Sequence, residues 1–156
     1  MQDLITQAHT VIDNNLYINI ASVSVDGKPW NTPVYAVHNN QLTFYWRSWI
    51  NAQHSQNILT NPKVCIAIYD SSKPLGTNHL GCVYLEAESF EVTDETEIAQ
   101  ALEMFTNNNL TVNDFMGDNV KRVYKAIPTK CWLNDKSESQ VTAETVKMRI
   151  EVPLFE

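Results

Sequence analysis

The chain has 156 residues, a length that favours one domain over two. Apolar residues make up 44% of it and charged residues 19%, a balance typical of a folded globular protein rather than a disordered one. The formal net charge is −7, and the 11 Lys and Arg residues are spread thinly along the chain. This argues against a nucleic-acid partner, because binding a phosphate backbone needs clustered basic side chains.

The sequence also gives expectations about the compartment. The first residues have neither a basic start nor a long apolar run, so no secretory signal peptide is predicted. No segment approaches the roughly 18 consecutive apolar residues of a membrane-spanning helix. The three cysteines, Cys65, Cys82 and Cys131, form no CxxC pair, and we interpret them as buried free thiols. We therefore predict a cytoplasmic protein with no membrane partner.

The N-terminal third predicts a helix followed by a three-stranded meander. Apolar residues at helical spacing predict the helix over 2–13. Alternating or β-rich runs predict three strands, over 17–25, 30–38 and 42–47. The first two strands are separated by Asp26-Gly27, which predicts a hairpin turn in which both residues adopt a positive φ. Asn39-Asn40 predicts the second tight turn.

The middle of the chain predicts a short helix and two further strands. The helix covers 51–60 and ends at Asn61-Pro62, because proline cannot continue a helix. The nearly continuous apolar run over 64–69 predicts a central strand. A loop over 70–80 and a long strand over 81–92 follow.

The last part of the chain predicts one more helix and more strands. Asp94 precedes Glu97 by three residues, which matches a capping box. The helix that follows carries one apolar stripe, formed by Ile98, Ala101, Leu102 and Phe105. It ends in the asparagine run 107–109. The runs 122–126 and 130–133 predict another strand, for which Pro128 offers a bend. A polar linker over 135–142 and a final strand over 144–152 follow. The elements indicate an α+β fold in which two or three helices flank an antiparallel barrel or a strongly curled sheet.

Several kinds of site have no signature in this sequence. It contains only four glycines and neither a GxGxxG motif nor a Walker loop, which excludes the usual dinucleotide and nucleotide cradles. The four histidines lie far apart and have no acidic partner at metal-ligand spacing, so no metal site is predicted.

The segment 44–58 carries the strongest signal for a ligand. It joins a strand to a helix, and the N-terminus of a helix favours an anion. Arg47 offers two parallel donors to a phosphate, and the hydroxyls of Ser48 and Ser55 add to them. His54 and Asn57 are three residues apart, which predicts that they share one face of the helix.

Aromatic residues in the same segment, Tyr45, Trp46 and Trp49, could flank a planar ring. A purely structural interpretation is also open. In it, Ser48 caps the helix, the aromatic side chains pack inside the barrel and Arg47 is solvated.

The order of these elements resembles that of the pyridoxamine-phosphate-oxidase-like flavoproteins. The likeness extends from about residue 17 to residue 69, and more weakly to residue 132. It is carried by the strand that contains Thr32-Pro33-Val34-Tyr35, the strand Phe44-Tyr45-Trp46-Arg47-Ser48 and the helix end Asn57-Ile58-x-x-Asn61-Pro62.

The resemblance implies one split β-barrel domain over 1–156, forming a homodimer that holds FMN in clefts between the subunits. Pro33, Val34 and Tyr35 would run beside the isoalloxazine ring. The residues implied to line the ribityl chain and the phosphate are Tyr45, Trp46, Arg47 and Ser48. Many members have a basic pair at the start of the helix, where this chain has Gln53 and His54.

His54, Ser55 and Arg47 would supply donors in place of that basic pair. Gln53 and Asn57 are the other helix residues implied to bind the cofactor. Trp132 would reach the flavin from the partner subunit. The oxidase activity itself is not implied, because 147–151 lacks the Arg-x-His type of pair that grips the oxidase's substrate.

Three functions remain open from the sequence. The first is an FMN-dependent oxidoreductase that acts on a small molecule of unknown identity, with the protein placing the flavin and excluding solvent. The second is a non-catalytic protein that holds flavin or haem on the same barrel. The third is a barrel that binds a deazaflavin or no cofactor.

Overall fold

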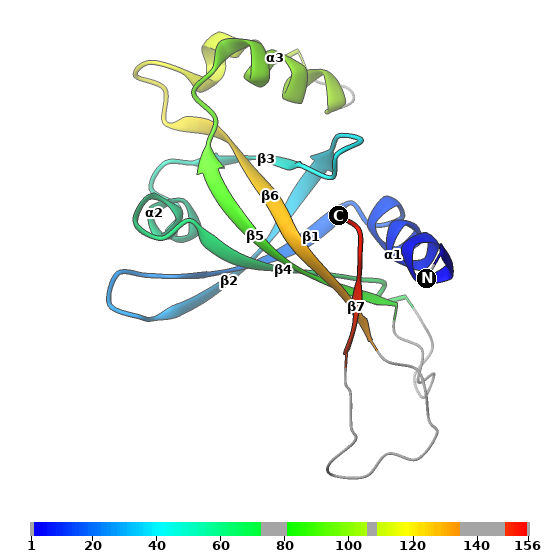
Figure 1. The fold of residues 1–156 in the computed structure, drawn as a ribbon. Helices are drawn as coiled ribbons and strands as arrows, with labels where there is room; N and C mark the ends of the chain where they lie inside the picture. The colour runs from blue at the N-terminus through cyan, green and yellow to red at the C-terminus, as the bar shows by residue number, and fades with distance from the viewer. Residues whose placement is uncertain (1, 73–80, 106–108, 135–148, 156) are drawn as a thin grey trace.

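The computed structural model describes residues 2–72, 81–105, 109–134 and 149–155, and the seven strands found there belong to one antiparallel sheet. The strands are β1 (Tyr17–Val23), β2 (Pro29–His38), β3 (Phe44–Trp49), β4 (Lys63–Tyr69), β5 (Cys82–Glu91), β6 (Lys121–Asn134) and β7 (Arg149–Val152). The helices are α1 (Gln2–Asp13), α2 (Gln53–Thr60), α3 (Glu95–Met104) and the 3-10 turn η1 (Val112–Phe115). Figure 1 shows them around the curled sheet.

The sheet closes on itself. Its order is β3-β2-β1-β4-β5-β6-β7, and β3 also pairs with β6, from Phe44 opposite Ala126 to Trp49 opposite Lys121. This closure confirms the predicted α+β split barrel with flanking helices. β7 extends the sheet beyond β6, and α3 lies over one end of the barrel (Figure 1).

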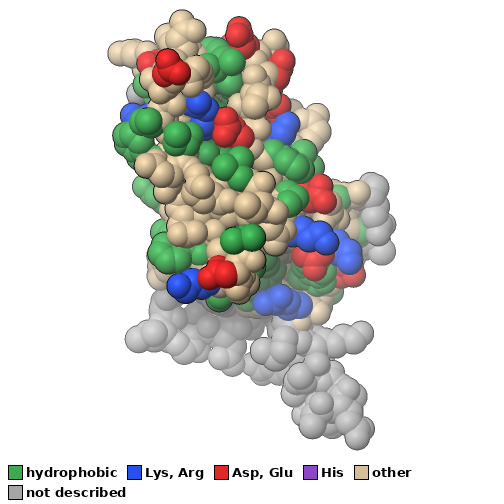
Figure 2. Space-filling view, turned by 90° about the vertical axis from the view of Figure 1, so that its left-hand side faces the viewer, with side chains coloured by type: hydrophobic (Ala, Val, Ile, Leu, Met, Phe, Trp, Pro, Cys, Tyr) green, Lys and Arg blue, Asp and Glu red, His purple; other side chains and the backbone are tan. Residues whose placement is uncertain are grey.

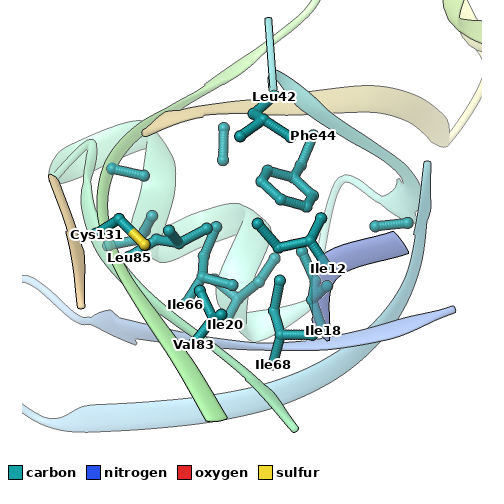
Figure 3. Packing of buried hydrophobic residues seen from close by; sticks show 14 of the residues in the cluster. Ile12, Ile18, Ile20, Leu42, Phe44, Ile66, Ile68, Val83, Leu85 and Cys131 are labelled. Atoms are coloured by element: carbon teal, nitrogen blue, oxygen red, sulfur yellow. The ribbon is translucent and has the colours of Figure 1, made fainter. Parts of the chain in front are cut away.

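The barrel interior is filled by the inward residues of the alternating strands. Ile18 and Ile20 on β1 and Ile66 and Ile68 on β4 are at most 1% exposed, as their alternation predicts. Ile12 of α1 joins this cluster, so the helix packs against the barrel core (Figure 3). A second apolar cluster, which includes Ile98, Ala101, Leu102 and Phe105, packs α3 against the outside of β3 and β6.

Two turn details differ from the expectation. Only Gly27 has a positive φ in the first hairpin, because the loop runs from Ser24 to Lys28 and Gly27 donates back to the carbonyl of Ser24. In the second turn the positive φ falls on Leu42, which is buried. The hairpins themselves are confirmed, and their loops are longer than two-residue turns.

The capping box is half formed. Asp94 caps α3 by accepting from the Glu97 amide at 2.8 Å. The Glu97 carboxylate does not reach back to the cap, since it binds Tyr45 and Lys125. In β6 the expected bend is a bulge: Glu86 pairs with Lys130 and Ala87 with Pro128, which leaves Thr129 as the extra residue.

The thiol prediction is partly wrong. Cys82 and Cys131 are buried, and burial raises the pKa of Cys131 to about 12. Cys65 is free but exposed, because it lies on the outward side of β4. Several predicted segments lie wholly or partly outside the described residues. They are the polar linker, the asparagine run that ends α3, most of the loop over 70–80 and the first half of the last strand.

Candidate functional site

The barrel opens between β2 and β3. The two strands pair only over three positions, Ala36–His38 against Phe44–Trp46. From Tyr35 back to Pro29, β2 pairs with β1 alone, and from Arg47 onward β3 pairs with β6 alone. The facing edges of the two strands therefore diverge, and this opening positions the candidate site.

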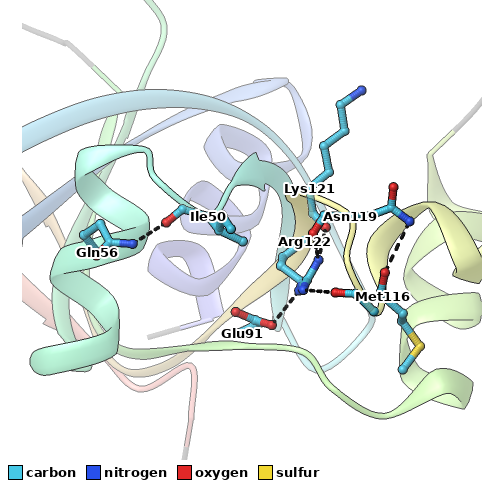
Figure 4. A network of polar contacts seen from close by, with 8 residues as sticks. Ile50, Gln56, Glu91, Met116, Asn119, Lys121 and Arg122 are labelled. Atoms are coloured by element: carbon cyan, nitrogen blue, oxygen red, sulfur yellow. Dashed lines mark hydrogen bonds and ion pairs between the residues drawn. The ribbon is translucent and has the colours of Figure 1, made fainter.

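Helix α2 begins at this opening, and two contacts fix the turn that leads into it. The Ile50 amide donates to the carbonyl of Val120 at 2.9 Å. The Gln56 side chain donates to the carbonyl of Ile50 at 2.5 Å (Figure 4). The helix starts at Gln53, two residues later than predicted, with Ala52 at the N-cap. Ala52 has no side-chain acceptor, and among the described residues no side chain caps the helix, so the purely structural interpretation is wrong in assigning this role to Ser48.

We call the space between α2 and the diverging strands the barrel cleft. Its volume is about 290 Å³, and it is lined by Thr32, Pro33, Val34, Tyr35, Arg47, Ser48 and His54. All of these except Thr32 are predicted cofactor-binding residues. Nothing in the sequence singles out Thr32 beyond its place in the β2 segment.

Two buried polar atoms in the cleft lack hydrogen-bond partners within the described residues. They are Nε2 of His54 and Oγ1 of Thr32. His54 is 5% exposed, and burial lowers its pKa, so the neutral imidazole is favoured at neutral pH. An orphaned buried donor or acceptor is costly, and such atoms are typical of places that a ligand or water fills.

Arg47 brings the positive charge to the cleft. Its guanidinium lies 4.6 Å from the centre of the Phe105 ring and makes no ion pair or hydrogen bond within the part of the chain that the structure describes. Among the residues that the structure describes, no carboxylate lines the cleft. The cation of Arg47, the hydroxyl residue Ser48 and the imidazole of His54, which belongs to the first turn of α2, therefore line one space. This arrangement suits an anion even though the whole chain is acidic.

Other predicted site residues point elsewhere. Successive residues of a strand face opposite sides, so Tyr45 and Trp46 cannot share one surface. Tyr45 lies under α3, where its hydroxyl donates to Glu97 at 3.0 Å. Trp46 is fully buried in the barrel and stacks on Tyr124, with 5.9 Å between the ring centres.

The helix residues divide between two sides. Gln53 donates to Asn57 at 2.8 Å, and Asn57 donates to Ser22 of β1 at 3.0 Å, which holds α2 to the barrel. Gln53 and Asn57 line a separate cleft beside the β1–β2 hairpin, so Asn57 does not face the barrel cleft with His54 as its spacing predicted. Ser55 is fully buried beside Tyr124.

Trp132 lies on β6 between Tyr84 of β5 and Glu151 of β7. It does not line the barrel cleft of its own chain. Its predicted role from a partner subunit stays a prediction.

A second cleft adjoins the barrel cleft, and it was not predicted from the sequence. We call it the α3 cleft; its volume is about 250 Å³, and it is lined by Arg47, Ser48, Trp49, Leu110, Phe115 and Lys121. Arg47 and Ser48 belong to both clefts. Leu110 and Phe115 are far from Arg47 in sequence and carry no motif, so no local signal could have placed them there.

The described residues include neither a metal-binding cluster nor a membrane-spanning helix. No group of three or more His, Cys, Asp or Glu side chains is placed to hold a metal ion there. In the same residues, no helix has the length and apolar character needed to cross a membrane.

Comparisons with known proteins agree with the fold. The model of the family described as pyridoxamine 5'-phosphate oxidase matches residues 4–147. No curated protein matches the chain in sequence.

Three solved structures illustrate the structural likeness. HutZ, the haem storage protein of Vibrio cholerae, has a TM-score of 0.68 at 16% identity, over 83% of this chain and 94% of that one. A haem-binding protein of Mycobacterium smegmatis has a TM-score of 0.73 at 14% identity, over 97% of this chain and 59% of that one. General Stress Protein 26 of Bacillus anthracis has a TM-score of 0.61 at 17% identity, over 83% and 92%. At these identities the likeness shows the fold alone.

Proposed function

Because this chain belongs to the pyridoxamine 5'-phosphate oxidase family, we propose that it binds FMN and holds the phosphate in the barrel cleft. The observation that carries the proposal is the buried Nε2 of His54, which has no partner among the described residues and lines the same cleft as Arg47, whose guanidinium is likewise unpaired there. Together with the Ser48 hydroxyl and the uncapped start of α2, these groups fit a phosphate monoester.

The remaining lining suits the rest of the cofactor. Pro33, Val34 and Tyr35 lie on the stretch of β2 that has no partner strand on its β3 side, so their main-chain groups are candidates to bind the polar edge of the flavin ring. Bound flavin would supply hydride and electron transfer. The protein would hold and orient it, and we propose an oxidoreductase acting on a small molecule.

At the start of α2 this chain has Gln53 and His54 in place of the basic pair of many family members, and this difference changes how the phosphate would be held. Gln53, at the first position of α2, is engaged with Asn57 on the hairpin side. The positive charge of the cleft therefore comes from Arg47 on β3, and His54 supplies a neutral donor. We expect a weaker grip than a pair of basic residues at the start of the helix would give.

An absorption titration tests the proposal. Adding FMN to the purified protein should shift the two flavin bands and quench flavin fluorescence. Arg47→Ala and His54→Ala should each weaken FMN binding by at least about tenfold, near 1.4 kcal/mol. His9→Ala on α1 and Lys63→Ala on β4 are controls outside the cleft and should bind as the wild type does. Unchanged affinity in both cleft variants would contradict the phosphate assignment.

Haem binding is the second candidate function. The specific observation is again His54, since a neutral imidazole with a free Nε2 is a common axial ligand of haem iron. Haem titration should then give a Soret band that His54→Ala removes and Arg47→Ala leaves in place. If FMN binds and haem gives no such band, the flavin assignment is preferred. Turnover with a reduced nicotinamide donor would then distinguish a flavin-dependent enzyme from a protein that only carries flavin.

We also propose that two copies associate, with the cofactor cleft at their interface. Large hydrophobic side chains that would favour burial remain exposed, among them Tyr17 at 62% and Trp49 at 52%. On the face that carries α2 and the β1–β2 hairpin, hydrophobic side chains are interspersed with charged ones (Figure 2). Sedimentation equilibrium should report a dimer, and Trp132→Ala should weaken FMN binding if the partner's indole reaches the flavin.

A further inference from the structure

Arg47 is held by an aromatic ring rather than by a carboxylate. Its Cζ atom lies 4.6 Å from the centre of the Phe105 ring. Phe105 is 3% exposed and forms the C-cap of α3, where its amide donates to the carbonyl of Leu102 at 3.2 Å. The ring also packs on Tyr35 of the barrel cleft, at 6.0 Å between ring centres. Phe105 therefore contacts both the cation and one wall of the cleft.

The chain offers a contrast in Arg122, which is held in the opposite way. Its Nε donates to Glu91 at 3.0 Å, and its terminal nitrogens donate to the carbonyls of Gly117 and Lys121, each at 2.8 Å (Figure 4). These contacts engage all three nitrogens of the Arg122 guanidinium, and the Glu91 carboxylate neutralises its charge. A ring contact uses only the flat face of a guanidinium, so the N–H donors of Arg47, which lie in its plane, stay available to a ligand.

The opposite end of α3 is anchored to the barrel. Glu97 in the first turn accepts from Tyr45 of β3 at 3.0 Å and from Lys125 of β6 at 2.8 Å. Ile98 and Leu102 pack into the cluster beneath the helix. This anchoring fixes the position of the C-cap, so the Phe105 ring is a defined support for a long and otherwise unpaired side chain.

We propose that Phe105 is a positioning residue that holds Arg47 toward the barrel cleft and thereby sets the preference for a phosphorylated over an unphosphorylated flavin. The inference rests on the proposed FMN site. Phe105 does not line the barrel cleft, so it acts through the guanidinium and not by contact with the phosphate.

The first test needs no flavin. Proton NMR of the flavin-free protein reports the Hδ and Hε resonances of Arg47, which the ring current of Phe105 should displace upfield. Phe105→Leu should return them to ordinary positions, while Phe105→Tyr should keep the displacement. Resonances that are the same in the wild type and in Phe105→Leu would overturn the proposal whatever the flavin result.

The second test compares the dissociation constants of FMN and riboflavin by fluorescence quenching. Phe105→Leu should weaken FMN binding by about two- to fivefold, the size of one cation–π contact, and leave riboflavin binding unchanged. Phe105→Tyr should restore the preference for FMN. In an Arg47→Ala background, Phe105→Leu should have no further effect on the ratio.

Ile98→Ala is the matched control. Ile98 is a fully buried residue of the same helix and lines neither the barrel cleft nor the α3 cleft. If Phe105 has only a packing role, Phe105→Leu and Ile98→Ala will change the binding of both flavins alike, and the proposal is overturned. A wild-type protein that shows the ring-current displacement but binds neither flavin would reject the proposed function, and the flavin preference with it, while the geometry would stand.

Discussion

The phenol of Tyr45 donates to Oε1 of Glu97 at 3.0 Å, and this contact joins β3 to the first turn of α3. Lys125 completes the group, since its ammonium lies 2.8 Å from both oxygens of the same carboxylate. All three side chains are at least partly shielded from solvent. The network explains why the carboxylate of Glu97 is withdrawn from the cap of its own helix.

Tyr45→Phe should lower the free energy of unfolding by about 1–2 kcal/mol, because it removes a hydrogen bond to a charged acceptor. Urea denaturation at neutral pH measures the change. Tyr124→Phe is the comparison: Tyr124 is also buried, but its hydroxyl has no hydrogen bond of normal geometry within the described residues. That variant should be neutral or slightly stabilising, and equal losses in the two variants would contradict the assignment.

Alkaline pH should weaken the fold partly through Tyr45. Burial, together with the neighbouring Glu97 carboxylate, raises its pKa from 10.0 to about 12. The unfolded chain therefore loses this proton at a lower pH than the folded chain, so the stabilisation is complete below pH 10 and is lost as the pH rises toward 12. Stability measured at pH 9 and pH 11 should fall more for the wild type than for Tyr45→Phe, and identical slopes would rule out this contribution.

Acid should act through His54. Burial lowers its pKa below 6.5, so the unfolded state takes up a proton before the folded state does. The stabilisation is fully present above pH 6.5 and is lost as the pH falls toward the lower, folded-state pKa. Between pH 7 and pH 5 the wild type should lose more stability than His54→Gln, and His9→Gln should follow the wild type.

Gly27→Ala should test the hairpin turn. The residue has φ +80°, and a Cβ there would meet no atom within 4 Å, so the expected cost of about 1–2 kcal/mol is backbone strain alone. Asn tolerates this region better than Ala, so Gly27→Asn should cost less. Thermal unfolding of the two variants gives the comparison, and equal losses would show that the φ value is not what selects glycine.

The sequence predicted most of the fold because its signals are local. Alternation located Ile18 and Ile20 in the core, Asn61-Pro62 ended α2, and Asp94 capped α3, each through neighbours a few residues away. The pairing of β3 with β6 had no such signal, because it joins segments far apart in the chain. Element order and family resemblance, rather than any motif, indicated a barrel.

The candidate site, like the fold, could be predicted from the sequence only where its residues are close together in the chain. Arg47, Ser48 and His54 meet in the barrel cleft, as the strand-to-helix segment indicated. The grouping of Tyr45 with Trp46 did not hold, because strand neighbours face opposite sides. Phe105 could not be connected to Arg47 from the sequence: it was recognised only as part of an apolar stripe, and its contact depends on how α3 packs over the barrel.

The divergence of β2 and β3 sets a trade-off between rigidity and binding. Each further rung added to the ladder beyond Ala36 and Trp46 would strengthen the barrel wall, and it would also consume the peptide groups that now border the cleft. Substitutions that extend this pairing should therefore raise thermal resistance and lower ligand affinity together. Where β2 and β3 are not paired with each other, the same backbone groups can either form the sheet or bind a ligand, so stability and recognition compete there.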